Sequence, residues 1–212
     1  MPLHAALVDL SLTAFSNRLA ERTPTPGGGS VAAHLVDVGA ALTAMACRFT
    51  SGEKFASVEG AMATRVEELE RLRGAVRPLV DQDSAAYDAV TAAYKLPKSN
   101  DAEKHARTTA IQGALRGALD VPARTLAHAL LALRVAAAAA PDVNPNLASD
   151  AATGVWCLRS AAEAAFLNVR INAGGLADKA WAAERRSECE RDLAEVRRLS
   201  DDARGAIDRR LG

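Results

Sequence analysis

Two aspartates, Asp81 and Asp83, stand close together in the segment LVDQDSAAY and are well suited to acid–base chemistry. Apolar residues spaced by three and four predict one face of a long helix, and Asp83 falls on that face between Val80 and Tyr87. A carboxylate at a core-facing position must be hydrogen-bonded, paired or protonated, because removing a bare charge from water is unfavourable. Such a group can act as a general base or stabilise a cation, or it can simply cap a neighbouring helix or pair with an arginine.

Asp81 lies two residues before Asp83, which places it about 200° away around a helix. We therefore expect the two carboxylates to face different environments and not to form a side-by-side acid pair. The apolar stripe favours Asp83 as the functional carboxylate of the two.

A glycine turn in the segment TPTPGGGS, residues 23–30, directly precedes an alanine-rich helix. Gly27, Gly28 and Gly29 allow a ligand to approach the main chain where a Cβ would clash. Free N–H groups at the start of the helix attract a carbonyl oxygen, a carboxylate or a phosphate. Ser30 is a good N-cap and is predicted to begin this helix. The same residues are also compatible with a tight turn between two helices and no ligand.

A stripe of mostly small residues follows one face of a helix predicted over residues 147–172. It consists of Asp150, Gly154, Cys157, Ala161, Ala165, Asn168 and Asn172. Small side chains leave space for a flat ligand, or they allow tight helix–helix packing. Asp150 and Asn172 are 22 positions apart, about 33 Å along one helix, so they cannot both reach one reacting carbon within one subunit.

Composition excludes several other classes of function. Lys+Arg and Asp+Glu both number 26 and aromatic residues make up 4%, which disfavours nucleic acid and anionic membranes as partners. No segment approaches the roughly 18 consecutive apolar residues of a membrane span, and none has the features of a secretory signal, so we expect a cytoplasmic protein. The scattered histidines and cysteines predict no metal site, and no dinucleotide or phosphate-loop motif occurs. The histidines are His4, His34, His105 and His128, and the cysteines are Cys47, Cys157 and Cys189.

Abundant alanine, long segments between prolines and glycines, and the absence of β-branched runs predict an all-α protein. We expect a single domain over residues 1–212, built as a bundle of five to six long helices with kinks at Pro78 and Pro122. The predicted helices cover about 3–21, 30–50, 57–95, 102–140, 147–172 and 176–209.

Several of these segments, in this order, resemble the cyclodeaminase/cyclohydrolase family of folate enzymes. This family includes the C-terminal domain of formiminotransferase-cyclodeaminase and stand-alone methenyltetrahydrofolate cyclohydrolases. The resemblance covers about residues 10–175. The matching segments are TPTPGGGSVAA (23–33), LVDQDSAAYDAV (79–90), KLPKSNDAEKHART (95–108), VPARTLAHA (121–129), NPNLASDAATGV (144–155) and LNVRIN (167–172). The sequence NPN and the pair Trp156–Cys157 depart from the family pattern, which leaves fine substrate preference open.

The resemblance implies an all-α fold that dimerises, a tetrahydrofolate one-carbon substrate, and neither a metal nor a cofactor. It assigns the catalytic carboxylate to Asp83 or Asp81. It places Lys54 as a partner for the glutamate tail of the substrate. The substrate-binding residues implied are Gly27, Gly28, Gly29, Ser30, Lys54, Asn146, Asp150 and Asn168.

The reaction that we expect from this resemblance is hydrolysis of 5,10-methenyltetrahydrofolate to 10-formyltetrahydrofolate, with the carboxylate as base and cation stabiliser. A cyclodeaminase that closes formimidoyltetrahydrofolate and releases ammonia is the first alternative, because both reactions pass through a similar charged tetrahedral carbon. A non-catalytic scaffold that binds folate or a partner helix is the second alternative.

Overall fold

The chain folds into helices only, over the residues 6–211 that this computed structural model describes. Three short 3-10 helices, η1 (Leu7–Asp9), η2 (Glu53–Phe55) and η3 (Pro145–Leu147), lie in the connections. The α-helices are α1 (Leu12–Ala20), α2 (Gly28–Arg48), α3 (Glu59–Tyr94), α4 (Asp101–Ala139), α5 (Ala148–Gly174) and α6 (Lys179–Leu211). The predicted all-α bundle is confirmed.

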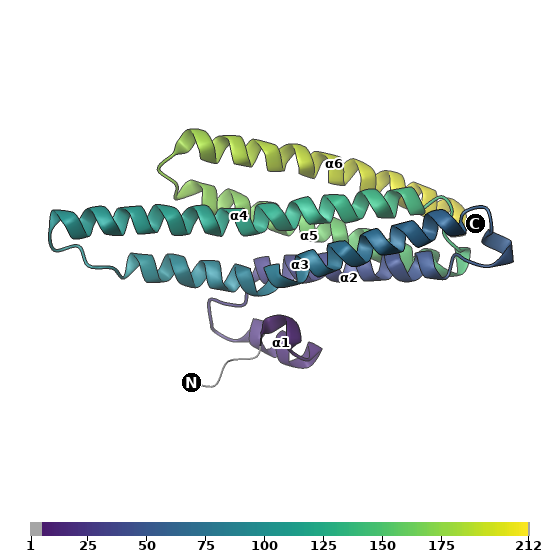
Figure 1. Ribbon diagram of the computed structural model, residues 1–212, viewed down its shortest axis with the longest axis horizontal. Helices are drawn as coiled ribbons and strands as arrows, with labels where there is room; N and C mark the ends of the chain where they lie inside the picture. Colours follow the sequence, from purple (N-terminus) through teal and green to yellow (C-terminus); the bar gives the residue numbers. More distant parts are fainter. Residues whose placement is uncertain (1–5, 212) are drawn as a thin grey trace.

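Helices α2, α3, α4 and α5 form an antiparallel four-helix bundle in which each helix contacts the next and α5 returns to α2. Helix α6 packs along α4 and α5 (Figure 1). The small-residue stripe of α5 serves close packing, because a Cβ added to Gly39 of α2 would lie 2.8 Å from the backbone oxygen of Gly154. Helix α2 is shorter than α3 and α4. At the end of the bundle where α2 begins, at Gly28, only α3, α4 and α5 therefore continue.

The N-terminal region differs from the single helix predicted over about residues 3–21. Its described part, from residue 6, comprises η1 and then α1, which Ser11 caps by accepting a hydrogen bond from the backbone N–H of Ala14. Asp81 holds η1 in place, since its carboxylate accepts hydrogen bonds from the N–H groups of Leu7 (2.6 Å) and Val8 (3.4 Å). These long-range bonds stabilise a break that local helix propensity does not predict.

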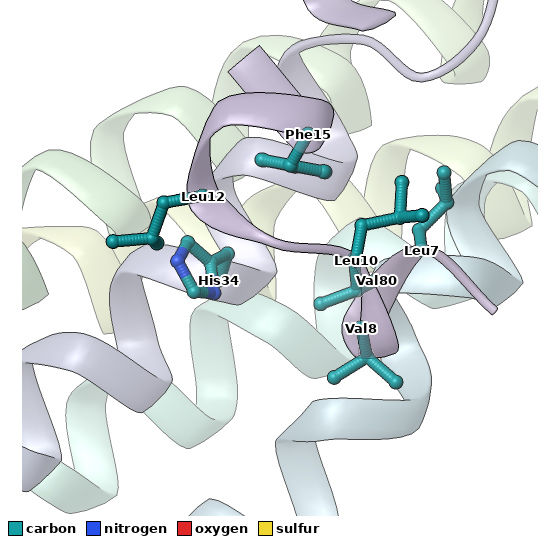
Figure 2. Close-up of a pocket in the computed structure, with 7 residues that line it drawn as sticks. All are labelled: Leu7, Val8, Leu10, Leu12, Phe15, His34 and Val80. Atoms are coloured by element: carbon teal, nitrogen blue, oxygen red, sulfur yellow. The ribbon is translucent and has the colours of Figure 1, made fainter. Parts of the chain in front are cut away.

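Apolar contacts attach this N-terminal segment to α2 and α3, as Figure 2 shows. They enclose a pocket of about 30 Å³, which has room for roughly one water molecule and none for an organic substrate. The residues around it are Leu7, Val8, Leu10, Leu12, Phe15, His34 and Val80.

The starts of two helices refine the sequence predictions. Gly27 is the N-cap of α2, so the prediction that Ser30 caps this helix is wrong, and the Ser30 side chain instead bonds to α3. Asn100 caps α4 by accepting a hydrogen bond from the N–H of Glu103 at 2.9 Å. Helices α3 and α4 run through Pro78 and Pro122 without a break.

Helices α2 and α4 are long and apolar enough to cross a membrane by length and composition alone, but 56% and 61% of their most apolar windows are buried inside the bundle. This burial is the pattern of core helices in a water-soluble bundle.

Candidate active site

A pocket of about 280 Å³ opens where α2 begins, between the glycine turn and helices α3, α4 and α5. Because α2 starts at Gly28 while its three neighbours continue, the pocket takes the place of the missing helix. The lining residues are Pro24, Thr25, Gly27, Gly28, Gly29, Asp83, Ala86, Tyr87, Val90, Leu115, Ala118, Asn168 and Asn172. Asp83 supplies the one carboxylate among these lining residues, and no Lys, Arg or His is present among them.

Asp83 lies directly against the glycine turn. Its Oδ2 is 3.1 Å from Ser30 Oγ, whose hydroxyl also donates to the backbone oxygen of Val80 at 2.8 Å. The backbone N–H of Ser30, in the first turn of α2, also hydrogen-bonds to the Asp83 carboxylate. A Cβ built on Gly29 would overlap this carboxylate, so glycine at position 29 allows the close approach of α3 to α2.

Burial raises the pKa of Asp83 above the ordinary value of 3.8, and the two hydrogen bonds from Ser30 partly oppose this shift. The carboxyl is half-buried and faces the pocket. A carboxylate that water solvates poorly is a stronger base than a free one, and it attracts a cation that enters the same site. Asp83 therefore has the position and the basicity required for proton transfer within the pocket.

Asp81 does not line this pocket. Its carboxylate binds the N-terminal segment as described above, and it borders hollows on the other side of the Thr25–Pro26 turn. The expectation that the two aspartates face different environments is confirmed, whereas the catalytic assignment of either one stays a prediction. Among residues 6–211 no group of three or more His, Cys, Asp or Glu side chains is arranged to hold a metal ion, and His4 lies outside that range.

Asn172 replaces a backbone hydrogen bond that α4 lacks at Pro122. A residue at position 122 with an N–H would donate to the carbonyl of Ala118, but proline has none. The Asn172 Nδ2 amide donates to that carbonyl instead, at 2.6 Å. Asn168 of the same helix donates through its Nδ2 to the backbone oxygen of Ala164 at 3.0 Å.

Both asparagines therefore use their amide nitrogens for the backbone and keep their amide oxygens for the pocket. No donor reaches either oxygen among the described part of the chain, and neither oxygen is buried without a partner. The sequence places Asn172 on the small-residue stripe but does not assign it a role. The only local sign is that Pro122 leaves the carbonyl of Ala118, four residues earlier, without its usual helical donor.

We expect Asn172→Ala to lower the free energy of unfolding by about 1–3 kcal/mol, because the Ala118 carbonyl loses its partner. The Pro122→Ala variant restores the backbone N–H that bonds this carbonyl, so the same asparagine substitution should be milder in that background. Urea denaturation of the four proteins in this double-mutant cycle measures the coupling. Equal losses in both backgrounds would contradict the role that we assign to Asn172.

Three other predicted substrate-binding residues, Lys54, Asn146 and Asp150, lie at the opposite end of α2. Helix α2 has 21 residues and is about 30 Å long, with Gly29 at one end and the 49–54 connection at the other. The 144–150 segment is fixed to this far end, because Asn144 Nδ2 donates to the backbone oxygen of Phe49. One chain thus brings Gly27, Gly28, Gly29, Ser30, Asp83 and Asn168 together and leaves Lys54, Asn146 and Asp150 apart from them.

Known proteins of similar sequence have the names of folate enzymes. A methenyltetrahydrofolate cyclohydrolase of Methylorubrum extorquens is 40% identical over 192 residues, which cover 90% of this chain and 92% of that protein. A formimidoyltransferase-cyclodeaminase of Rattus norvegicus is 31% identical over 209 residues, which cover 97% of this chain but 38% of the rat protein. The similarity to the rat protein therefore concerns only part of that longer enzyme.

A solved structure has the same fold. Formiminotetrahydrofolate cyclodeaminase from Thermotoga maritima aligns with a TM-score of 0.85 and 28% identity, covering 94% of this chain and 96% of that chain. The family described as formiminotransferase-cyclodeaminase matches residues 11–191, a range that includes the glycine turn, Asp83 and both pocket asparagines. With this match over most of its length and these relatives, the chain belongs to the formiminotransferase-cyclodeaminase family.

Proposed function

We propose that this protein hydrolyses 5,10-methenyltetrahydrofolate to 10-formyltetrahydrofolate. The observation that carries the proposal is the half-buried Asp83 carboxylate, which is the one ionised group expected among the residues lining a pocket of otherwise neutral side chains. The one-carbon bridge of the substrate is a delocalised amidinium cation between N5 and N10. A single negative charge in a partly desolvated pocket is complementary to that cation. The similarity to a cyclohydrolase over 92% of its length supports the same assignment.

Asp83 is proposed to transfer the proton on which the reaction depends. It orients a water molecule at the bridge carbon and takes one proton as the C–O bond forms. The resulting neutral carbinolamine collapses when the C–N5 bond breaks, the Asp83 acid returns its proton to N5, and the hydroxyl proton leaves to solvent. One water molecule is consumed, one proton is released, and Asp83 is again a carboxylate. The electrophile comes from the substrate itself, so the proposed reaction includes no cofactor.

The remaining pocket groups suit the reduced pterin ring. The amide oxygens of Asn168 and Asn172 are acceptors, and the aminopyrimidine half of the ring presents N–H donors. Gly27 and Gly28 offer main chain without side chains, against which a flat ring can lie. We also propose that the protein works in the cytoplasm as a homodimer, with folate as its ligand and neither nucleic acid nor membrane as a partner.

The pH dependence should report the Asp83 pKa. Because the free carboxyl has a raised pKa and must be ionised to act as a base, kcat/KM should fall as the pH drops through a value above 3.8. Ser30→Ala removes a hydrogen bond that lowers this pKa, so the acid limb should move to higher pH. The bound cation favours the carboxylate, so the acid limb of kcat should lie at lower pH than that of kcat/KM. Stopped-flow rates across pH test all three shifts, and an unchanged limb in Ser30→Ala would argue against Asp83 as the titrating base.

A cyclodeaminase reaction is the second candidate, because the similar solved structure carries that name. It would close formimidoyltetrahydrofolate by attack of N10 and release ammonia at the same carboxylate. Incubating the purified protein with each substrate separates the two reactions. We expect the methenyl absorbance to decay faster than in buffer, with no ammonia from the formimino substrate. Ammonia release together with a buffer-like methenyl decay would favour the cyclodeaminase.

A further inference from the structure

The segment KLPKSNDAEKHART, residues 95–108, is one of those that resemble the family, yet the site described above does not use it. It joins the end of α3 to the start of α4 and carries four Lys or Arg side chains against two Asp or Glu. Figure 1 shows this connection beyond the start of α2, at the same end of the molecule as the pocket. A positively charged segment near a pocket suits an anionic part of a ligand.

Arg107 in this segment has hydrogen-bonding capacity that the chain does not use. Its Nη2 donates to the backbone oxygen of Tyr94 at 3.1 Å, and its guanidinium carbon lies 5.6 Å from the centre of the Tyr94 ring. Its Nε is enclosed and has no hydrogen-bond partner, the one such atom among the side chains of residues 6–211 that are not exposed. No carboxylate of residues 6–211 forms an ion pair with Arg107. Because enclosed N–H groups are normally paired and guanidinium groups bind carboxylates well, Arg107 is suited to a carboxylate that comes from a ligand.

A continuous strip of side chains connects Arg107 to the pocket. This strip, called the α3–α4 strip below, consists of Tyr87, Val90, Tyr94, Arg107, Ile111 and Leu115. At about 100° per residue, its α3 members lie within about 60° of one another and its α4 members within about 80°. Tyr87, Val90 and Leu115 also line the pocket. The strip thus begins in the pocket and ends at the guanidinium.

The surface of the α3–α4 strip is apolar and partly aromatic up to Arg107. Ile111 and Leu115 are buried and form its floor, whereas Tyr87 and Tyr94 are 46% and 51% exposed. Half-exposed aromatic rings can stack against a flat ring of a ligand, because their faces remain accessible.

We propose that the α3–α4 strip binds the p-aminobenzoyl-glutamate arm of the substrate and that Arg107 binds a carboxylate of the glutamate. The inference rests on the proposed function, which places the one-carbon bridge beside Asp83. The arm begins at N10 of this bridge, continues as a flat aromatic ring and ends in two carboxylates. The strip presents complementary groups in the same order, first the Tyr87 ring and then the Arg107 guanidinium.

The length of the arm agrees with the length of the strip. Asp83 and Tyr94 are 11 positions apart, which is about 16 Å along α3. The arm spans about 11 Å, the reach of roughly three extended residues. A hydrogen bond of about 3 Å at each end extends this reach to about 17 Å. Lys54, which the resemblance implies as the partner of the glutamate, lies about 30 Å from the pocket within one chain and is beyond this reach.

The test removes the carboxylates from the substrate and the guanidinium from the protein. The first is done with 5,10-methenyltetrahydropteroate, which lacks the glutamate. For wild type, its KM should be about 10-fold above that of 5,10-methenyltetrahydrofolate, because a charge-assisted hydrogen bond is lost. Arg107→Gln should show the higher KM with both substrates and keep kcat within about twofold, since Arg107 is remote from the reacting carbon. Arg107→Lys keeps the charge without the planar fork and should retain part of the preference.

The ratio of the two KM values separates binding from a structural role. If Arg107 only capped the end of α3, Arg107→Gln would change both KM values and leave their ratio as in wild type, and this result would overturn the inference. Loss of the preference in Lys54→Gln together with its persistence in Arg107→Gln would overturn it as well.

Arg116→Gln is the matched control on the same helix. The Arg116 guanidinium also lies over an aromatic ring, at 5.0 Å from the centre of Trp181, but it is paired with Asp178 and faces another side of α4. This variant should keep the 10-fold preference for the substrate with glutamate. Loss of the preference in Arg116→Gln would show that any lost charge on α4 has this effect, contrary to the inference.

Equilibrium binding distinguishes failure of this inference from failure of the proposed function. Calorimetric titration with 5-formyltetrahydrofolate and 5-formyltetrahydropteroate measures the same preference without turnover. A preference that depends on Arg107, in a protein that does not hydrolyse the methenyl bridge, would contradict the proposed function alone. Hydrolysis with equal KM values for both substrates in wild type would overturn the inference alone, and binding of neither ligand would overturn both.

Discussion

Replacing Asp83 by asparagine is expected to lower kcat by roughly 10²–10⁴-fold, the usual contribution of a general base. Asparagine has nearly the same shape, and its amide oxygen can still accept the hydrogen bonds from Ser30 that the carboxylate now accepts. The loss should therefore be chemical, and a folate product should still bind. Stopped-flow decay of the methenyl absorbance measures kcat, and fluorescence titration with folate measures binding.

The same variant should be at least as stable as wild type at neutral pH. A carboxyl whose pKa is raised on folding contributes stability at low pH, and this stability is lost as the pH rises through the folded-state pKa. A neutral amide removes that loss, so the thermal midpoint at pH 7 should not fall.

Asp81→Asn is the matched control for this substitution. It weakens the cap on the N-terminal segment, so that segment should exchange its amide hydrogens faster while kcat stays close to the wild-type value. Wild-type turnover in Asp83→Asn would support a non-catalytic scaffold or another base. A large loss of kcat in Asp81→Asn alone would move the catalytic role to that residue.

Adding one methyl group at Gly29 should be the second most damaging change, with kcat lowered by roughly 100-fold. The Cβ would overlap the Asp83 carboxylate, so the first turn of α2 or the carboxylate must move. Either movement changes the position of the carboxylate relative to the pocket. Steady-state kinetics and circular dichroism of Gly29→Ala measure the loss and confirm that the helices remain.

Two other glycines provide controls for this effect. A Cβ at Gly28 meets nothing within 4 Å, so Gly28→Ala should keep kcat and alter only KM through the methyl group that it adds to the pocket wall. Gly113→Ala, on an exposed part of α4 and also without a neighbour within 4 Å, should leave both constants unchanged. Equal kcat values for Gly29→Ala and Gly113→Ala would contradict the contact between Gly29 and Asp83 as a requirement for turnover.

The sequence predicts the helices well because their periodicity and their proline and glycine boundaries are local properties. It places Asp83 on the inward side of α3 for the same reason. It does not predict the break between η1 and α1, since the N–H groups of that break are satisfied by Asp81, more than 70 residues away. Nor does it predict that Ser30 bonds to α3 and not to its own helix end.

Some residues of the pocket can be recognised from the sequence, and others cannot. The glycine turn and Asp83 have distinctive residue types, so both are recognisable from the order of amino acids alone. Leu115 and Ala118 of α4 line the same pocket but carry no chemistry that would identify them in the sequence. The separation of Lys54, Asn146 and Asp150 from Asp83 depends on the antiparallel course of the chain, which motif order along a sequence does not reveal.

In the proposed reaction, the Asp83 carboxylate beside the Gly29 turn meets the cationic one-carbon bridge of a folate. A crystal structure with a stable analogue of the methenyl substrate tests this contact most directly. We expect the bridge carbon to lie within reach of Asp83 through one water molecule, with hydrogen bonds of roughly 3 Å, and the pterin ring to lie against Asn168 and Asn172. A bridge carbon bound beside Asp81, or anywhere remote from both Asp83 and Gly29, would contradict the claim.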